Sequence, residues 1–60
     1  MGITQNPRTA ESAFDELVQL VNGNQIAAER LIRIESRLFP SASRLELIER
    51  AIARKLHDRP

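Results

Sequence analysis

Pro40 limits the fold of this chain more than any other residue. A proline cannot continue a helix, and it disfavours helical backbone in the residue before it, which here is Phe39. Ser43 follows three residues later and opens the sequence Ser-Arg-Leu-Glu. This sequence has the form of a capping box, in which the serine and glutamate side chains bond each other's free backbone amides. The chain is therefore predicted to end one helix and begin another at this corner.

Apolar side chains before Gly23 recur at steps of three and four, which is the period of one helix face rather than the alternation of a strand. They are Ala10, Phe14, Leu17, Val18 and Val21. Thr9 or Ser12 can cap the first amides, and Asn22-Gly23-Asn24 consists of residues that tolerate left-handed backbone. The pattern predicts a helix over residues 10–21.

The same spacing predicts two more helices, over residues 25–39 and 43–57. The second helix, with Asn24 as its cap, has a stripe formed by Ala27, Leu31, Ile34 and Leu38. This stripe is widened to an arc of roughly 160° by three more apolar side chains, Ala28, Ile32 and Phe39. The third helix has a stripe formed by Leu45, Ile48, Ile52 and Leu56. Two acid-first pairs four residues apart are expected to add stability, Glu29 with Arg33 and Glu46 with Arg50.

Three helices of three to four turns, joined by short connections, define the expected fold class as all-α, a compact three-helix domain. Residues 9–58 are expected to form this single domain, and residues 1–8 a flexible N-terminal arm. A chain of 60 residues hides only about 60% of the surface that it exposes when unfolded, which leaves its stability marginal. Because it has no cysteine, neither a disulfide nor a thiolate metal site can add support, and a homodimer is expected instead.

Leucine and isoleucine side chains displaced from the three stripes suggest where a second copy binds. Leu20 and Ile26 lie to one side of their stripes, and Leu47 lies about 140° from the centre of the third stripe, at 100° per residue. One such side chain is ordinary, but several indicate a surface shared with a second copy or with another protein. The alternative is that the helices cross obliquely and cover these side chains within one chain.

The charges are divided unevenly along the chain. Residues 1–29 carry one basic and four acidic side chains, whereas residues 30–60 carry eight basic and four acidic ones. Acids interleaved with bases are typical of solvated helix faces with ion pairs, but a basic half can also contact phosphates or an acidic partner. The candidates for such contacts are Arg30, Arg33, Arg37, Arg44, Arg50 and Arg54.

No constellation for catalysis is recognisable. His57 is the sole histidine and lies near the carboxyl end, where its charge suits the helix dipole better than it would serve a metal or a serine. Gly2 and Gly23 form no phosphate-binding loop. We therefore expect a protein without catalytic, metal or cofactor-binding residues and without a small-molecule substrate. No apolar run approaches the roughly 20 residues of a membrane span, and no secretory signal is recognisable, so a cytoplasmic location is expected.

The sequence Ser-Arg-Leu-Glu-Leu-Ile-Glu-Arg-Ala-Ile, residues 43–52, resembles the start of the second helix of ribbon-helix-helix repressors, and residues 28–39 are similar to their first helix. This resemblance covers about half of the chain. It implies a DNA-binding regulator that reads DNA with a strand before its first helix, paired with the same strand of a second subunit. The corresponding segment, residues 14–25, has helical spacing here, so the strand that reads DNA in those repressors is expected to be missing.

A helix-turn-helix protein is the other DNA-binding alternative, with Gly23 in the turn and the second helix inserted into the duplex groove. Arg30, Arg33 and Arg37 lie opposite much of the apolar face of that helix and could bind phosphates. The order of a Phe-Asp-Glu-Leu-Val opening, an Asn-Gly turn, a proline corner and a capped last helix also resembles small uncharacterised cyanobacterial helical proteins. That resemblance implies a cytoplasmic bacterial protein and no site residues. A protein-interaction module is the leading expectation, and a DNA-binding regulator the second.

Overall fold

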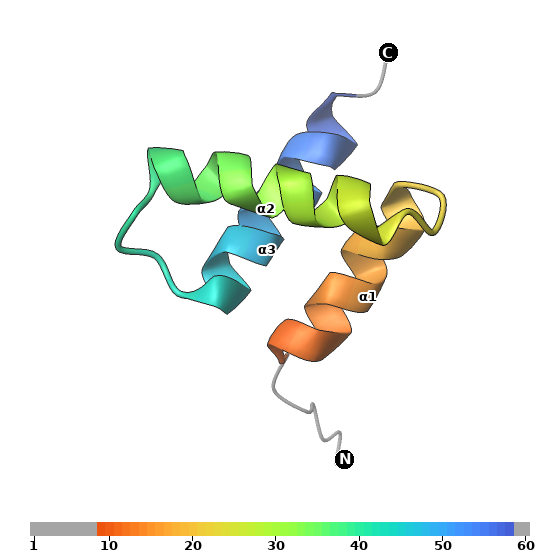
Figure 1. Cartoon of the computed structure of the whole chain (residues 1–60), viewed down its shortest axis with the longest axis horizontal. Coiled ribbons are helices and arrows are strands. Elements are labelled where there is room, and N and C mark those ends of the chain that lie inside the picture. The colour runs from red at the N-terminus through yellow and green to blue at the C-terminus, as the bar shows by residue number, and fades with distance from the viewer. Residues whose placement is uncertain (1–8, 59–60) are drawn as a thin grey trace, which may run out of the picture.

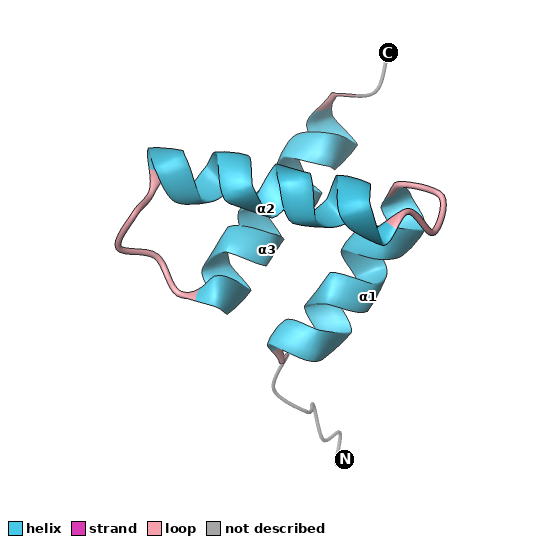
Figure 2. Ribbon diagram, in the orientation of Figure 1, coloured by secondary structure: helices cyan, strands magenta, loops and turns pink. Residues whose placement is uncertain are grey.

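The computed structural model describes residues 9–58, and this part of the chain contains three helices and no strand (Figures 1 and 2). They are α1 (Ala10–Leu20), α2 (Gln25–Leu38) and α3 (Arg44–His57). Helix α2 crosses over α3, and α3 packs against both other helices (Figure 1). The all-α class is confirmed, and each helix boundary lies within one residue of the prediction. The predicted arm, residues 1–8, lies outside the described residues.

Local sequence explains where α1 begins and ends. Thr9 Oγ1 accepts a hydrogen bond from the Ser12 amide at 3.1 Å, and Ser12 Oγ accepts one from the Thr9 amide at 3.3 Å, which completes a capping box. At the other end Asn22 and Gly23 have positive φ angles of 61° and 81°. The Gly23 amide donates to the Val18 carbonyl at 2.8 Å, so the left-handed pair closes the helix as expected.

The proline corner also forms as expected, with one difference in its capping. Helix α2 stops at Leu38, two residues before Pro40. Ser43 Oγ accepts a hydrogen bond from the Glu46 amide at 3.2 Å and so caps α3. The carboxylate of Glu46 instead accepts from Arg50, so the return half of the predicted capping box is not formed.

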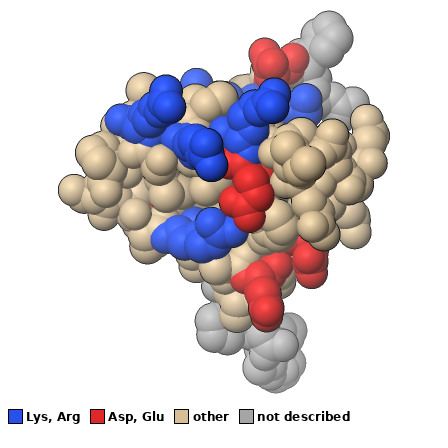
Figure 3. Space-filling model, in the orientation of Figure 1, with Lys and Arg blue, Asp and Glu red and all other residues tan. Residues whose placement is uncertain are grey.

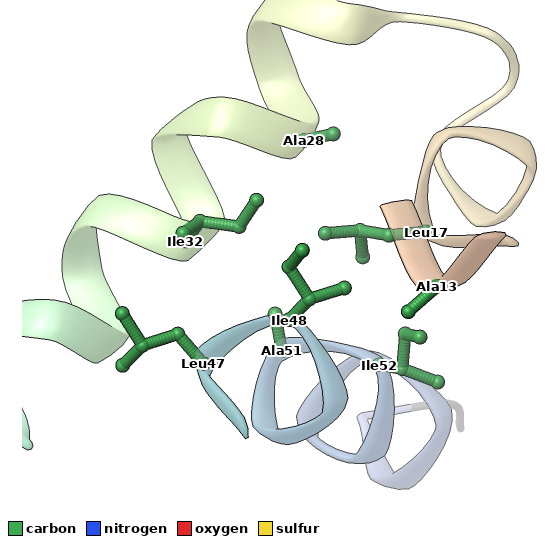
Figure 4. Close-up of a cluster of buried hydrophobic side chains, with 8 residues drawn as sticks. All are labelled: Ala13, Leu17, Ala28, Ile32, Leu47, Ile48, Ala51 and Ile52. Carbon is green, nitrogen blue, oxygen red and sulfur yellow. The ribbon is translucent and has the colours of Figure 1, made fainter. Parts of the chain in front are cut away.

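The core lies where α3 meets the other two helices. Eight apolar side chains from all three helices are buried there (Figure 4), namely Ala13, Leu17, Ala28, Ile32, Leu47, Ile48, Ala51 and Ile52. Figure 4 shows Leu47 beside Ile32 of α2 and Ile52 beside Ala13 of α1. Helix α3 is therefore covered on two sides, and its buried arc is wider than one apolar stripe.

Two leucines of α3 differ from the sequence-based expectation because of this arrangement. Leu47 was expected on the exposed side, but it is only 9% exposed because α2 covers that side of the helix. Leu56 was expected in the core stripe, but it is 47% exposed because it lies one turn beyond Ile52, the last buried residue of α3.

These two leucines give a direct test of the fold. Leu47→Ala removes a buried side chain and is expected to lower the free energy of unfolding by about 2 to 5 kcal/mol. Leu56→Ala is expected to cost less than about 1 kcal/mol because the side chain already contacts water. Urea unfolding followed by circular dichroism measures both at one protein concentration. Equal losses in the two variants would contradict the burial of α3 on two sides.

Candidate interaction surface

The three residues expected to form an interaction surface lie in different environments. Leu20 is half-buried and packs against the core, and Leu47 is buried within it. Ile26 alone is exposed as expected, with 74% of its surface accessible. These three side chains therefore do not form one continuous exposed surface.

The apolar arc of α2 is divided between the core and the molecular surface. The core side carries Ala28 and Ile32 together with Glu35, which is only 1% exposed. Ile34 and Leu38 were expected to face the core, but they are 46% and 55% exposed. The arc was too wide to show which half would be buried, and a carboxylate at a core-facing position was not expected.

Four apolar residues of α2 form a second stripe beside the core. We call Ala27, Leu31, Ile34 and Leu38 the α2 stripe. Its steps of four, three and four are those of a helix that packs lengthwise against another helix. Ala27 and Leu31 are half-buried, and the other two members are exposed. No described helix of the same chain covers the exposed half of the stripe.

A groove continues the α2 stripe toward the carboxyl end of α3. The α2–α3 groove has a volume of about 120 Å³ and is lined by Leu31, Ile34, Glu35, Ala51, Arg54, Lys55 and Asp58. Leu31 and Ile34 line it with apolar surface from α2, whereas Lys55 of α3 and Asp58, the C-cap residue of α3, place one positive and one negative charge at its other end. Neither of these two forms an ion pair with another described residue.

The groove also contains the ion pair between Glu35 and Arg54. Arg54 Nε lies 2.5 Å from Glu35 Oε2, and Arg54 Nη2 lies 3.4 Å from Oε1. The carboxylate is buried, while 57% of the arginine side chain is exposed. The hydrogen bond to Glu35 and the negative charge of that residue raise the pKa of Arg54 above its ordinary value. The buried carboxylate is thus satisfied by an arginine that reaches in from solvent.

Two other arginines of α3 also have partners within the domain. Arg44 Nη2 lies 3.2 Å from Glu29 Oε2, and its guanidinium lies 5.7 Å from the centre of the Phe14 ring. Glu29 was expected to pair with Arg33, but it bonds Arg44 across helices instead. The second arginine, Arg50, forms the expected pair with Glu46 at 3.2 Å, and its guanidinium lies 3.8 Å from the centre of the Phe39 ring.

Three arginines of α2 remain without such partners. Arg30, Arg33 and Arg37 are exposed and form no ion pair with any other residue in the part of the chain that the structure describes. We call these three residues the arginine face of α2. Figure 3 shows basic side chains gathered over α2, with acidic side chains between them, toward α1 and at the carboxyl end of α3. The six candidate arginines therefore divide into three with internal partners and three on an open face.

Residues 9–58 contain neither a cluster of metal-ligand side chains nor a transmembrane helix. No group of three or more histidine, cysteine, aspartate or glutamate side chains in this range could hold a metal ion. Within the same range, no helix combines the length and the apolar character of a transmembrane segment. The α2 stripe with its groove and the arginine face are thus the candidate surfaces for binding a partner.

Comparisons with known proteins found no matching family model, no matching curated protein and no matching solved structure.

Substitutions of the two residues of the buried ion pair are expected to change the stability of the protein in different directions. Glu35→Leu removes the buried charge and frees an arginine that water can solvate, so stability is expected to be unchanged or higher by about 1 to 4 kcal/mol. Arg54→Ala leaves the buried carboxylate unpaired and is expected to lower the urea midpoint. The double variant should match Glu35→Leu because the arginine matters only while the carboxylate is present. An Arg54→Ala protein as stable as the original chain would refute this assignment.

Proposed function

We propose that this protein is a non-enzymatic helical interaction module that associates with a second copy of itself through the α2 stripe. The exposure of Ile34 and Leu38 beside the α2–α3 groove is the observation that carries this proposal. Large apolar side chains at helix-packing spacing are covered most simply by another helix. The proposal includes the cytoplasmic location expected from the sequence.

The α2 stripe is complementary to itself when two copies run antiparallel. In that arrangement Ile34 faces Leu31 of the second copy, and Leu38 faces Ala27 of the second copy. The most exposed member of the stripe thus meets its smallest member, which avoids both a collision and a gap. An antiparallel pair also aligns the two helix dipoles favourably.

The charges on the groove are complementary in the same arrangement. A two-fold contact presents the same surface from both copies, so every pairing occurs twice. Lys55 of one copy can pair with Asp58 of the other, and the reverse pair forms on the opposite side of the axis. These two pairs would give both charges at the carboxyl end of α3 a partner beside the apolar residues Leu31 and Ile34 of the groove.

The size of the required interface is reasonable for this chain. A stable interface removes about 800 Å² from each partner, which is about one sixth of the 4691 Å² surface of this protein. The α2 stripe alone is too narrow for that area, so the end of α3 must contribute as well. Such burial would support a domain that is marginal by size alone.

DNA binding is the second candidate function, and the arginine face of α2 is the observation that favours it. The helix-turn-helix alternative places α2 against a duplex, and its exposed arginines suit that position. For the ribbon-helix-helix alternative, most of the segment that corresponds to the reading strand lies in α1 and the turn after it. Residues 9–58 therefore contain no strand that could read DNA as the strand of a ribbon-helix-helix repressor does.

The dimer is tested by placing a charge in the α2 stripe. The original chain is expected to show twice its mass of 6.8 kDa in light scattering at micromolar concentration. Ile34→Asp and Leu38→Asp are each expected to weaken association at least 100-fold, because a carboxylate would be buried without a partner. Helicity by circular dichroism should be retained, since both side chains are exposed in the single chain.

Ile26→Asp is the matched control. It introduces the same charge on the same helix at a more exposed isoleucine outside the stripe, and it is expected to leave the dimer intact. A folded original chain that keeps the single-chain mass throughout the micromolar range would end the proposal. Dissociation of the Ile26 variant to the same degree would show that the dimer contact is not confined to the α2 stripe.

A further inference from the structure

The arginine face differs from Arg44, Arg50 and Arg54 because its side chains form no ion pair with a described residue. Arg44, Arg50 and Arg54 each bond a carboxylate within the domain, and two of them also cover a phenylalanine ring. The three arginines of α2 have no such role. Three guanidinium groups on one side of a helix, with no carboxylate of residues 9–58 paired to them, suit an anionic partner in charge and geometry.

The arginine face and the core lie on opposite sides of the α2 stripe. At 100° per residue, the core-facing residues of α2 lie about 100° to one side of the stripe, and the three arginines lie about 70° to 130° to the other side. In an antiparallel pair, the two-fold axis is perpendicular to the plane that contains both α2 helices. Rotation about this axis keeps both arginine faces on the same side of the dimer, away from α3.

We infer that this joined surface of six arginines binds the phosphate backbone of duplex nucleic acid without reading its sequence. The inference rests on the dimer proposed above. Guanidinium groups match phosphate oxygens in geometry and charge, and contacts to phosphates need no apolar surface. Ile26 is the only large apolar side chain near the centre of this face, so an amphipathic partner helix would find little to bury.

The positions of the two aromatic residues favour a duplex over a single strand. Proteins that bind single strands stack bases on exposed aromatic rings. Phe14 and Phe39 are both half-buried, and each ring lies against an arginine of α3. No aromatic ring among the described residues is thus open to a base, whereas the phosphates of a duplex are accessible without stacking.

Dimer formation and duplex binding should strengthen each other. Pairing of the α2 helices brings Arg30 of one copy near Arg37 of the other, and these like charges oppose association. Phosphates placed between them remove that repulsion. Each event therefore increases the affinity of the other by the same factor.

The test uses a mixed-sequence DNA duplex of 20 base pairs and fluorescence anisotropy between 20 and 200 mM NaCl. The association constant is plotted against the NaCl concentration, both as logarithms. Six phosphate contacts predict a straight line with a slope of about −5. Arg33→Gln removes two contacts from the dimer and should make the slope shallower by about 2. Arg50→Gln removes the same charge from an arginine that is already paired, and it should leave the slope unchanged.

Two further variants separate this inference from the proposed dimer. The triple variant Arg30→Gln, Arg33→Gln, Arg37→Gln should lose duplex binding at least 100-fold while it remains a dimer. Ile34→Asp should bind as a single chain with a slope no steeper than about −3. An original chain that is dimeric but does not bind duplex at 20 mM NaCl overturns the inference and leaves the dimer standing. Equal binding of polyglutamate and duplex would overturn the assignment to nucleic acid.

Discussion

The burial of α3 between α1 and α2 is the constraint on which the rest of the structure depends. It brings Leu47 and Ile48 into one core although they point to different sides of their helix. It also sets the rotation of α2 about its own helix axis, because Ala28 and Ile32 must face α3. Once α2 is held in this rotation, Ile34 and Leu38 are left at the surface and the arginine face is turned away from the core. Both surface features thus follow from the packing of one helix.

The sequence predicted the helix ends, which depend on neighbouring residues, but it misassigned the local bonds of Glu29 and Glu46 and missed the contacts that depend on distant residues. Caps, turns and the proline corner are local, and Thr9, Gly23 and Pro40 marked the helix ends to within one residue. The rotation of α2 could not be predicted from its apolar arc, because the side of the helix that packs on α3 carries Ala28, Ile32 and a carboxylate, Glu35, while Ile34 and Leu38 stay exposed. The ion pair of Glu35 with Arg54 joins residues 19 positions apart, and no spacing rule within one helix could indicate it.

The arginines of this small domain fall into two groups, those with an ion-pair partner in the described residues and those without one. The expectation of helix faces with ion pairs holds for α3, whose arginines bond Glu46 of the same helix and Glu29 and Glu35 of α2. It does not hold for the outer side of α2, where Arg30, Arg33 and Arg37 form no ion pair with a described residue and the neighbouring acid, Glu29, bonds Arg44. The distinction was not visible in the sequence, because the pairs that neutralise α3 are formed largely with side chains of α2.

The buried carboxylate of Glu35 has a consequence for how this chain can change over time. Its charge is tolerated only while an arginine reaches it from α3, so position 54 is constrained for as long as position 35 remains acidic. In descendants of this chain, loss of the arginine should follow rather than precede replacement of the glutamate by an apolar residue. An arginine at position 54 can thus outlast the glutamate at position 35, whereas a glutamate left there without the arginine should not persist in a stable fold.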